Sequence, residues 1–481
     1  MITALGTILI PAAIFCFLLR PFYLLPLLLI SSLFEVASVF NGAIGDYIFG
    51  VPPVYFVEVL IAVRLALLLK EKGRLLPSRN SPTRPLAWLL IVYWGWAVAS
   101  SFIMPRLFAG MPVYSPREGV DVELSALAPL TWSLSNLAQA TYLTLNVAVL
   151  FYTFLAVKTE TLSKVMTKAF YWTAIIASIA GIVQLLAATF GLSYPYEIFN
   201  NNPAYAQGFD EDIGNYHRIT STFGEPSGAG SFLAAVAVGF LARYLREKHS
   251  LTSLISFFVV SLLLLATTAT TGYVEFLIAF LLLMAYWNLV QRNNQRRGAQ
   301  SKVWLLAAGL AAVAGAIVFY NPSFLETMGE VTIEKSGTMS FVHRLTSDAY
   351  ALWLAKDTWG LGVGLGSNRP SSLIPALIST VGIVGTALFG LIICRIIRLF
   401  PGKSAPSYIQ MSFWAFITIL IGSAVGVPDM NRPALWGLSM VAVGQLAVYA
   451  KRQVLVAQLV QQLPSHLGVS LDGSAGIAPS S

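Results

Sequence analysis

The sequence predicts an all-α polytopic integral membrane protein, with about 13 transmembrane helices and long outer loops that contain short interfacial helices. Of its 481 residues, 56% are hydrophobic and 11% are charged, and the mean hydropathy is +0.72. A soluble domain carries roughly 25% charged residues. The apolar residues also gather into runs of spanning length, since a helix needs about 20 of them to cross a bilayer.

Thirteen such runs follow one another along the chain. They lie at about 3–19, 21–40, 52–69, 86–104, 134–156, 168–190, 227–245, 251–268, 271–289, 303–320, 372–394, 408–426 and 433–450. The first two are separated only by Arg20-Pro21 and could form one broken helix. No basic segment precedes the first run, which favours a retained helix over a cleaved signal. We expect residues 1–452 to form one transmembrane domain and residues 453–481 to be a disordered tail.

Basic residues mark the predicted cytoplasmic side. Short loops between the runs, together with Arg20, Lys451 and Arg452, carry 21 Lys and Arg residues, whereas the opposite side carries eight. By the positive-inside rule the basic loops and the C-terminal tail face the cytoplasm. The same clustering explains the net charge of +8 without a nucleic-acid partner.

The predicted outer loops are long, at about 105–132, 191–226 and 321–371. Loops beyond roughly 12–15 residues in a compact protein are usually functional or disordered, and the aromatic residues in these loops favour function. Cys16 and Cys394 lie in apolar runs, which excludes a disulfide framework. The chain has no Walker loop or dinucleotide fingerprint, and its two outer histidines are too few for a zinc site. We therefore expect no cofactor and no metal.

The first candidate site is the stretch 216–227, which leads into the apolar run at 227. Arg218 lies on the side where basic groups are scarce, and its guanidinium matches phosphate oxygens in a bidentate manner. Pro226 suits the first turn of a helix and disfavours helical geometry at Glu225, so we expect Glu225 to point into the outer loop. The free N–H groups of the helix start would also attract an anion. The alternative is that Arg218 pairs with the acidic residues 210–212.

A second His-Arg pair, His343-Arg344, precedes a later span. Apolar positions within 341–360 predict a short interfacial helix there. Asp348 follows Arg344 by one helical turn, so an ion pair between them is the alternative to ligand binding. If Arg218 and Arg344 converge from their separate loops, together they could neutralise a pyrophosphate.

Four ionisable residues are candidates for proton transfer or substrate contact. His217 and His343 are the predicted outer-side histidines, and a neutral histidine can accept a hydroxyl proton near neutral pH. Either could instead be a hydrogen-bonded loop residue, and Glu225 competes with them as a base. Glu275, near the outer end of its span, could reach the same cavity. Glu35, Glu58 and Arg64 are the other ionisable groups predicted within spans.

The glycine-rich stretch 362–370 is a further candidate for ligand contact. Ser367 or Asn368 can cap the following helix, and Pro370 suits its first turn. The alternating glycines could let the backbone approach a ligand and orient N–H groups as an anion nest, or they could form a hinge. Ser367, Asn368 and Arg369 are therefore candidate substrate contacts.

Taken together, these motifs resemble those of the O-antigen ligase and polymerase superfamily. Arg218 followed by the sequence TFGEPS at 222–227 resembles the signature before that superfamily's central helix. His343-Arg344, the glycines at 362–366 and the sequence VGIVG at 381–385 resemble its second block, so the likeness covers about 215–395. It implies a metal-independent, inverting glycosyltransferase of the GT-C type in the bacterial inner membrane. Arg218 and Arg344 match positions that grip the pyrophosphate.

The resemblance implies a substrate and partners as well. The donor would be an undecaprenyl-pyrophosphate-linked oligosaccharide at the periplasmic face, and a chain-length regulator and a flippase would be candidate partners beside membrane lipid. Many members have His-Asn after the glycine block, whereas this chain has Ser367-Asn368-Arg369. We therefore favour a polymerase of exopolysaccharide or O-antigen repeat units over a ligase acting on a lipid A-core acceptor. A transporter or flippase is the alternative from another class, and charges within the spans such as Glu35 and Glu58 favour it.

Overall fold

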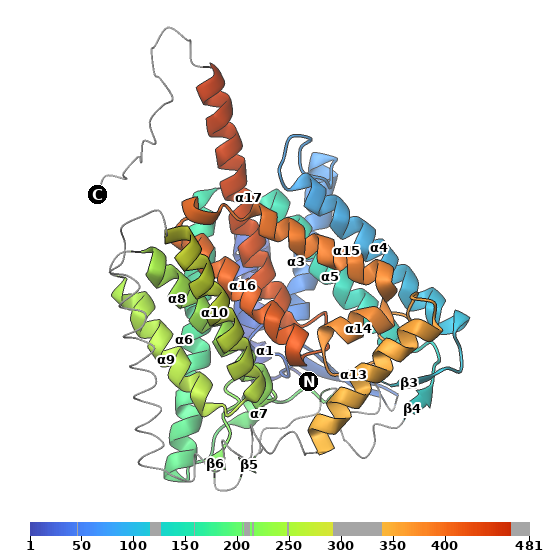
Figure 1. The fold of residues 1–481 in the computed structure, drawn as a ribbon. Helices are drawn as coiled ribbons and strands as arrows, with labels where there is room; N and C mark the ends of the chain where they lie inside the picture. Colours follow the sequence, from blue (N-terminus) through green and yellow to red (C-terminus); the bar gives the residue numbers. More distant parts are fainter. Residues whose placement is uncertain are drawn as a thin grey trace.

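The computed structural model describes residues 1–45, 47–115, 127–157, 159–203, 205, 212–213, 216–247, 250–291 and 339–462. Within these residues the chain is an all-α membrane protein, and eight helices are long and apolar enough to cross a bilayer (Figure 1). These are α4 (Arg84–Leu107), α5 (Leu134–Ala156), α6 (Glu160–Phe190), α8 (Pro226–Arg246), α10 (Thr270–Gln291), α15 (Gly382–Leu399), α16 (Ser407–Gly426) and α17 (Pro433–Gln462).

The other described elements are shorter or more polar. The helices are α1 (Ala4–Leu19), η1 (Pro21–Tyr23), α2 (Leu24–Ser31), α3 (Pro53–Lys72), α7 (Tyr196–Phe199), α9 (Leu251–Ala266), α13 (Met339–Asp357), α14 (Leu373–Thr380) and η3 (Gly402–Ser404). Three antiparallel hairpins are formed by β1 (Phe40–Ile44) with β2 (Tyr47–Val51), β3 (Pro112–Tyr114) with β4 (Leu127–Pro129), and β5 (Asp212–Ile213) with β6 (Tyr216–His217). Every crossing segment seen here is helical because a backbone in lipid must satisfy its own hydrogen bonds.

Most predicted spans that fall within the described residues form helices. Those at 86–104, 134–156, 227–245, 408–426 and 433–450 are confirmed as α4, α5, α8, α16 and α17. The run predicted at 303–320 lies outside the described residues. Helix α17 continues to Gln462, whereas a disordered tail was predicted from residue 453, and residues 463–481 are not described.

The predicted helix over 21–40 is wrong in its second half. Helix α2 ends at Ser31, and the chain then runs through turns and extended backbone into the β1–β2 hairpin. The N–H of Thr3 donates to the carbonyl of Val39 at 3.1 Å, so this non-helical segment pairs with the start of the chain. Glu35 therefore lies in the connection after α2 and not within a transmembrane helix, which corrects the sequence prediction.

The predicted helix over 372–394 is broken between α14 and α15. Gly382 has φ +72°, in the left-handed region that favours glycine. A Cβ at this position would lie 2.4 Å from the carbonyl oxygens of both Gly360 and Leu361. The break is thus produced by a loop from far along the chain that packs directly against the backbone of the helix.

Helix α8 is the most buried of the eight candidate spans and packs against α9, α10 and α16 (Figure 1). Small residues permit this close approach, because a Cβ on Gly272 of α10 would lie 2.8 Å from the backbone of Gly230 of α8. On the opposite side of α8, a Cβ on Gly239 would lie 2.9 Å from the carbonyl of Met411 of α16. The start of α8 is therefore fixed in position by helices on several sides.

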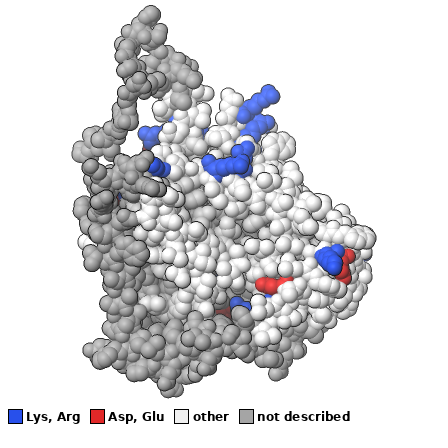
Figure 2. Space-filling view, viewed as in Figure 1, with Lys and Arg blue, Asp and Glu red and all other residues white. Residues whose placement is uncertain are grey.

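Charged residues divide the molecule into two ends. The basic end carries the Lys and Arg residues of the last turns of α3, α8 and α15 and of the first turn of α4. Figure 2 shows these cations gathered at the end from which α17 projects. The opposite end, which we call the loop end, carries the three hairpins, α7 and α13 (Figure 1).

Candidate functional site

Arg218 contacts the turn between α9 and α10, residues 267–271, at the loop end. Its Nε donates to Thr268 Oγ1 at 3.0 Å, and its Nη2 donates to the Thr268 carbonyl at 3.4 Å. Thr268 has φ +48° and Ser221, three residues after Arg218, has φ +55°. Such left-handed backbone is uncommon for residues other than glycine and is found more often at functional sites. Each residue in this conformation costs about 1–3 kcal/mol.

Arg344 extends from α13 toward the end of α16, next to the start of α10. A Cβ placed on Gly426, the last residue of α16, would lie 3.5 Å from Arg344 Nη1 and 3.0 Å from Thr271 Cγ2. Thr268 and Thr271 are three residues apart, so their Cα atoms are separated by at most about 11 Å. The fold therefore brings the two predicted arginines to one short turn, and the missing side chain at Gly426 leaves room for the second guanidinium.

The predicted pairing of Arg344 with Asp348 is not the contact that forms. The Asp348 carboxylate accepts hydrogen bonds from the backbone N–H groups of Ser371 and Ser372 at 2.7 and 3.1 Å, and from the Ser372 hydroxyl at 2.6 Å. Asp348 thus fixes the chain at the start of α14. Of the acidic residues considered as partners for Arg218, positions 210 and 211 lie outside the described residues.

Glu225 stands immediately before α8, with its side chain exposed. Its backbone is extended, with φ −140° and ψ 149°, which confirms the non-helical geometry predicted from Pro226. One carboxylate oxygen accepts from the hydroxyl of Ser227 at 3.0 Å. Glu225 is therefore exposed at the loop end, four residues after Ser221 and its left-handed backbone.

The two outer histidines have different surroundings. Nε2 of His217 lies 2.7 Å from the hydroxyl of Tyr196, which also accepts from Gln184 Nε2 at 3.1 Å. His343 packs edge-to-face against Tyr114, with ring centroids 5.7 Å apart, and is the neighbour of Arg344. Within the described residues, no three His, Cys, Asp or Glu side chains lie close enough together to hold a metal ion.

The glycine block and its polar neighbours serve contacts within the protein. Gly362, Gly364 and Gly366 all have positive φ, and a Cβ at any of them would lie 2.7–2.8 Å from a neighbouring atom. Asn368 accepts from the N–H of Tyr114 at 3.0 Å, and Ser367 accepts from Asn136 at 2.7 Å. Both side chains are buried, whereas Arg369 is exposed, so Arg369 is the member of the predicted trio that can meet a ligand.

Arg432 forms a buried ionic centre that the sequence analysis did not assign. Only 3% of its surface is exposed. Nε donates to Glu35 at 3.3 Å, Nη1 donates to Ser231 Oγ at 2.9 Å, and Nη2 donates to the Gly228 carbonyl at 3.1 Å. The guanidinium thereby links the start of α17, the connection after α2 and the first turns of α8. The sequence signal available for it was an arginine directly before Pro433, at the start of a span.

Glu275 is fully buried in α10, against α16. A Cβ on Gly422 would lie 1.9 Å from one of its carboxylate oxygens, so the glycine makes the space that the carboxylate occupies. Ser231, which accepts from Arg432, lies beside this carboxylate. Neither oxygen of Glu275 has a hydrogen-bond partner of ordinary geometry among the described residues. An unpaired carboxylate at this depth is costly, which makes Glu275 a functional candidate.

Asp429, in the connection between α16 and α17, is another residue that the sequence analysis did not assign. It accepts from the N–H of Asn431 at 2.8 Å, and Asn431 is in turn held by Gln139 of α5 at 2.7 Å. Burial raises the pKa of Asp429, although the Asn431 N–H and the positive charges of Arg369 and Arg432 oppose this shift.

The electrostatic environment of Asp429 is shared with its neighbours. Burial raises the pKa of Glu35, against the opposing charge and hydrogen bond of Arg432. The negative charge of Asp429 adds to the upward shift of the Glu35 pKa. These acids therefore lie near one another at the loop end, close to the start of α8.

The other ionisable groups predicted within spans lie in α3. Glu58 is buried, and one of its carboxylate oxygens has no hydrogen-bond partner among the described residues. Arg64 donates to the carbonyl of Phe17 in α1, and its guanidinium lies 4.5 Å from the centroid of the Phe17 ring. Arg64 therefore stabilises the packing of α1 against α3.

No protein-family model matches this chain, and no protein of curated function matches it. The fold and the site define it as a multi-pass helical membrane protein. Two arginines, several buried acids and an exposed glutamate are gathered at the end of the bundle opposite its basic loops.

Proposed function

We propose that this protein is a membrane glycosyltransferase that polymerises undecaprenyl-pyrophosphate-linked oligosaccharide repeat units. The observation that supports it most strongly is that Arg218 contacts Thr268 of the α9–α10 turn, while Arg344 lies beside Gly426, next to Thr271 at the start of α10. Two guanidinium groups on a surface otherwise poor in cations match the charge of a diphosphate. The sequence resemblance to the O-antigen ligase and polymerase superfamily adds the glycan and the lipid carrier.

The proposed orientation follows from the basic end. By the positive-inside rule this end faces the cytoplasm, so the loop end and its arginines face the periplasm and the C-terminus is cytoplasmic. The eight long helices, α1, the broken segment through α2, α3, α9 and the run at 303–320 would together give the thirteen predicted crossings. The site would then lie where a lipid-linked sugar emerges from the outer leaflet of the bacterial inner membrane.

In the proposed reaction a hydroxyl of the acceptor sugar attacks the anomeric carbon of the donor. The bond between that carbon and the pyrophosphate oxygen breaks with its electron pair, and undecaprenyl pyrophosphate leaves, so the configuration at the anomeric carbon is inverted. Arg218 and Arg344 would offset the charge that grows on the leaving group, at about 1.5–3 kcal/mol for each charge-assisted hydrogen bond. The N–H groups at the start of α8 would add a partial positive charge.

The proton of the attacking hydroxyl needs an acceptor. Glu225 is an exposed carboxylate at the start of α8, and His343 is adjacent to Arg344. Either group can lie within reach of a sugar bound between the two arginines.

The test is reconstitution of the purified protein with lipid-linked repeat units. Arg218→Ala and Arg344→Ala should each abolish chain extension while the protein still purifies as a folded membrane protein. Arg106→Ala is the matched control, because Arg106 is also a loop-end arginine but lies over the Trp132 ring at the end of α4. Chains of normal length from either site variant would refute the assignment.

A lipid-linked oligosaccharide flippase is the second candidate, and two observations favour it. The broken helix at α14–α15 and the unpaired buried carboxylate of Glu275 are features that transporters use. The same reconstitution separates the candidates. Longer glycans indicate a polymerase, transfer to a lipid A-core acceptor indicates a ligase, and translocation without new glycosidic bonds indicates a flippase.

A further inference from the structure

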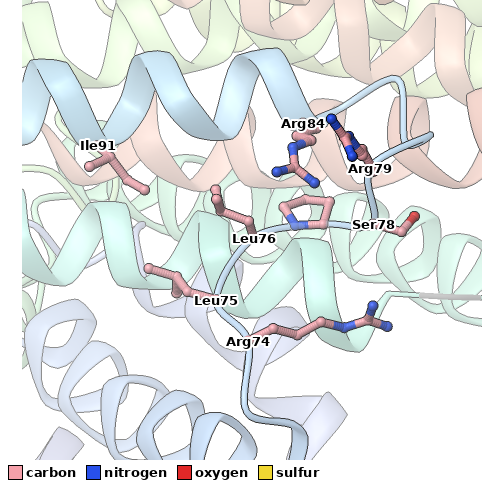
Figure 3. A pocket seen from close by; sticks show the side chains of 8 residues that line it. Arg74, Leu75, Leu76, Ser78, Arg79, Arg84 and Ile91 are labelled. Carbon is pink, nitrogen blue, oxygen red and sulfur yellow. The ribbon is translucent and has the colours of Figure 1, made fainter.

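A pocket of about 440 Å³ lies at the basic end, between the end of α3 and the start of α4. Arg74, Arg79 and Arg84 line one part of it, and Leu75, Leu76 and Ile91 line the other. Figure 3 shows the three arginines toward one side of the pocket and the apolar side chains toward the opposite side. The pocket is therefore amphipathic, with a cationic part and an apolar part.

Among the residues that the structure describes, no acidic side chain offsets the positive charge of this pocket. Elsewhere at the basic end, Arg243 pairs with Glu247 at 2.8 Å and Arg452 pairs with Glu160 at 3.1 Å. In the part of the chain that the structure describes, Arg74, Arg79 and Arg84 have no carboxylate within ion-pair distance. Helix α4 adds to the charge, since its first turn contains no acidic residue and the side chain of its N-cap Thr83 makes no capping hydrogen bond to the helix.

The apolar part of the pocket extends along α4. Arg84 is the first residue of α4 and Ile91 is two helical turns further along, about 10 Å deeper in the predicted membrane. Arg74 and Arg79 are exposed, and Arg84 is half-buried. A ligand that fills the whole pocket must therefore carry a negative charge at the membrane surface and an apolar portion below it.

We propose that this pocket binds an anionic phospholipid of the cytoplasmic leaflet, with its phosphate between the arginines and the start of its acyl chain against Leu75, Leu76 and Ile91. Arginine is suited to phosphate by its planar fork of donors. Basic pockets between transmembrane helices on the cytoplasmic side bind anionic headgroups for the same reason. The site is at the opposite end from the proposed catalytic arginines, so it is independent of the proposed function.

The experiment is a titration of delipidated, detergent-purified full-length protein with phosphatidylglycerol, followed by native mass spectrometry. The triple variant Arg74→Ala/Arg79→Ala/Arg84→Ala should bind phosphatidylglycerol about 100-fold more weakly, since each arginine near an anionic headgroup contributes about fivefold. Phosphatidylcholine, which has a phosphate but no net charge, should bind weakly to both proteins.

A charge-matched control uses three other cations of the basic end, in Arg395→Ala/Arg398→Ala/Lys403→Ala. This variant should keep wild-type affinity, because these residues do not line the pocket. A variant with lysine at the three pocket positions guards against misfolding, and it should bind with intermediate affinity. An equal loss in the pocket and control triples would overturn the proposal, because it would show diffuse attraction. Glycerol phosphate binding as tightly as phosphatidylglycerol would overturn the assignment to a lipid.

Discussion

Replacing Arg432 with methionine tests whether a buried ion pair holds the loop end together. The substitution removes hydrogen bonds to Glu35, to the Ser231 hydroxyl and to the Gly228 carbonyl, all of which lie near the first turns of α8. Methionine retains much of the packing volume. The stability change therefore reports mainly on the lost charge and hydrogen bonds.

The expected magnitude follows from the groups that remain. Glu35, whose side chain is 18% exposed, would lose its only ion-pair partner among the described residues. Glu35 can avoid carrying an unpaired charge by taking up a proton. If its pKa in the unfolded chain has the ordinary value of 4.5, this protonation costs about 3.4 kcal/mol at pH 7. The Ser231 hydroxyl and the Gly228 carbonyl would each lose one hydrogen bond, at up to about 1–3 kcal/mol each, but rearrangement and partial exposure reduce the sum. We expect a loss of about 3–5 kcal/mol, the usual range for breaking a buried pair.

The assay is thermal unfolding of the purified protein in detergent. Arg452→Met is the matched control, because Arg452 pairs with Glu160 where the side chains are 67% and 48% exposed, and such surface pairs contribute about 0–1 kcal/mol. Adding Glu35→Gln to Arg432→Met should recover part of the loss, since it removes the unpaired carboxylate. Similar melting temperatures for Arg432→Met and Arg452→Met would refute the reasoning.

Three further predictions concern single positions. Gly366→Ala should destabilise the protein by about 1–3 kcal/mol, because the φ of Gly366 is +84° and the new Cβ would lie 2.8 Å from the Ser135 carbonyl. Gly390→Ala is the control: Gly390 has open space around it in α15, so this substitution should be neutral or stabilising in the same melting assay. Because burial raises the pKa of Asp429 above its ordinary 3.8, the folded state binds this proton more tightly; its stabilising effect is complete at low pH and is lost as the pH rises through the raised pKa. Asp429→Asn should therefore make the fall in melting temperature between pH 4 and pH 7 shallower, and an unchanged slope would contradict this. Glu275→Gln should leave the melting temperature unchanged or higher, because its carboxylate has no hydrogen-bond partner of ordinary geometry among the described residues, and a loss of activity in that stable variant would give Glu275 a functional role.

The helical spans were predictable from sequence because their cause is local. A segment of about 20 apolar residues has no stable conformation in lipid other than a helix or a closed barrel, so composition alone predicts α4, α8 and α16. The break between α14 and α15 was not predictable in this way. It depends on the approach of residues 360–361 to Gly382, and hydropathy contains no information on that contact.

The candidate site was predicted only in part, because some of its features also depend on contacts between distant parts of the chain. Scarcity of outer cations pointed to Arg218 and Arg344, and each side chain reaches the α9–α10 turn. The glycine block shows the limit of the method. Gly362 and Gly364 have positive φ, and their backbone packs closely against other atoms. These atoms belong to α14 and α4, whereas the sequence analysis also considered a ligand there. Asp429 was missed because its burial and its interaction with Arg369 depend on how distant parts of the chain pack together.

The buried ion pair and the proposed catalytic arginines are connected through α8. Arg432 binds the carbonyl of Gly228 and the hydroxyl of Ser231, within the first turns of the helix that begins directly after Glu225. A displacement of that helix start would shift Glu225 and the free N–H groups relative to Arg218, which is held separately by Thr268. Because misplacing reacting groups by about 1 Å can cost a factor of about 100 in rate, Arg432→Met should lower chain extension even at temperatures where the variant remains folded. Wild-type extension rates in a folded Arg432→Met protein would show that the start of α8 does not set the geometry of the site.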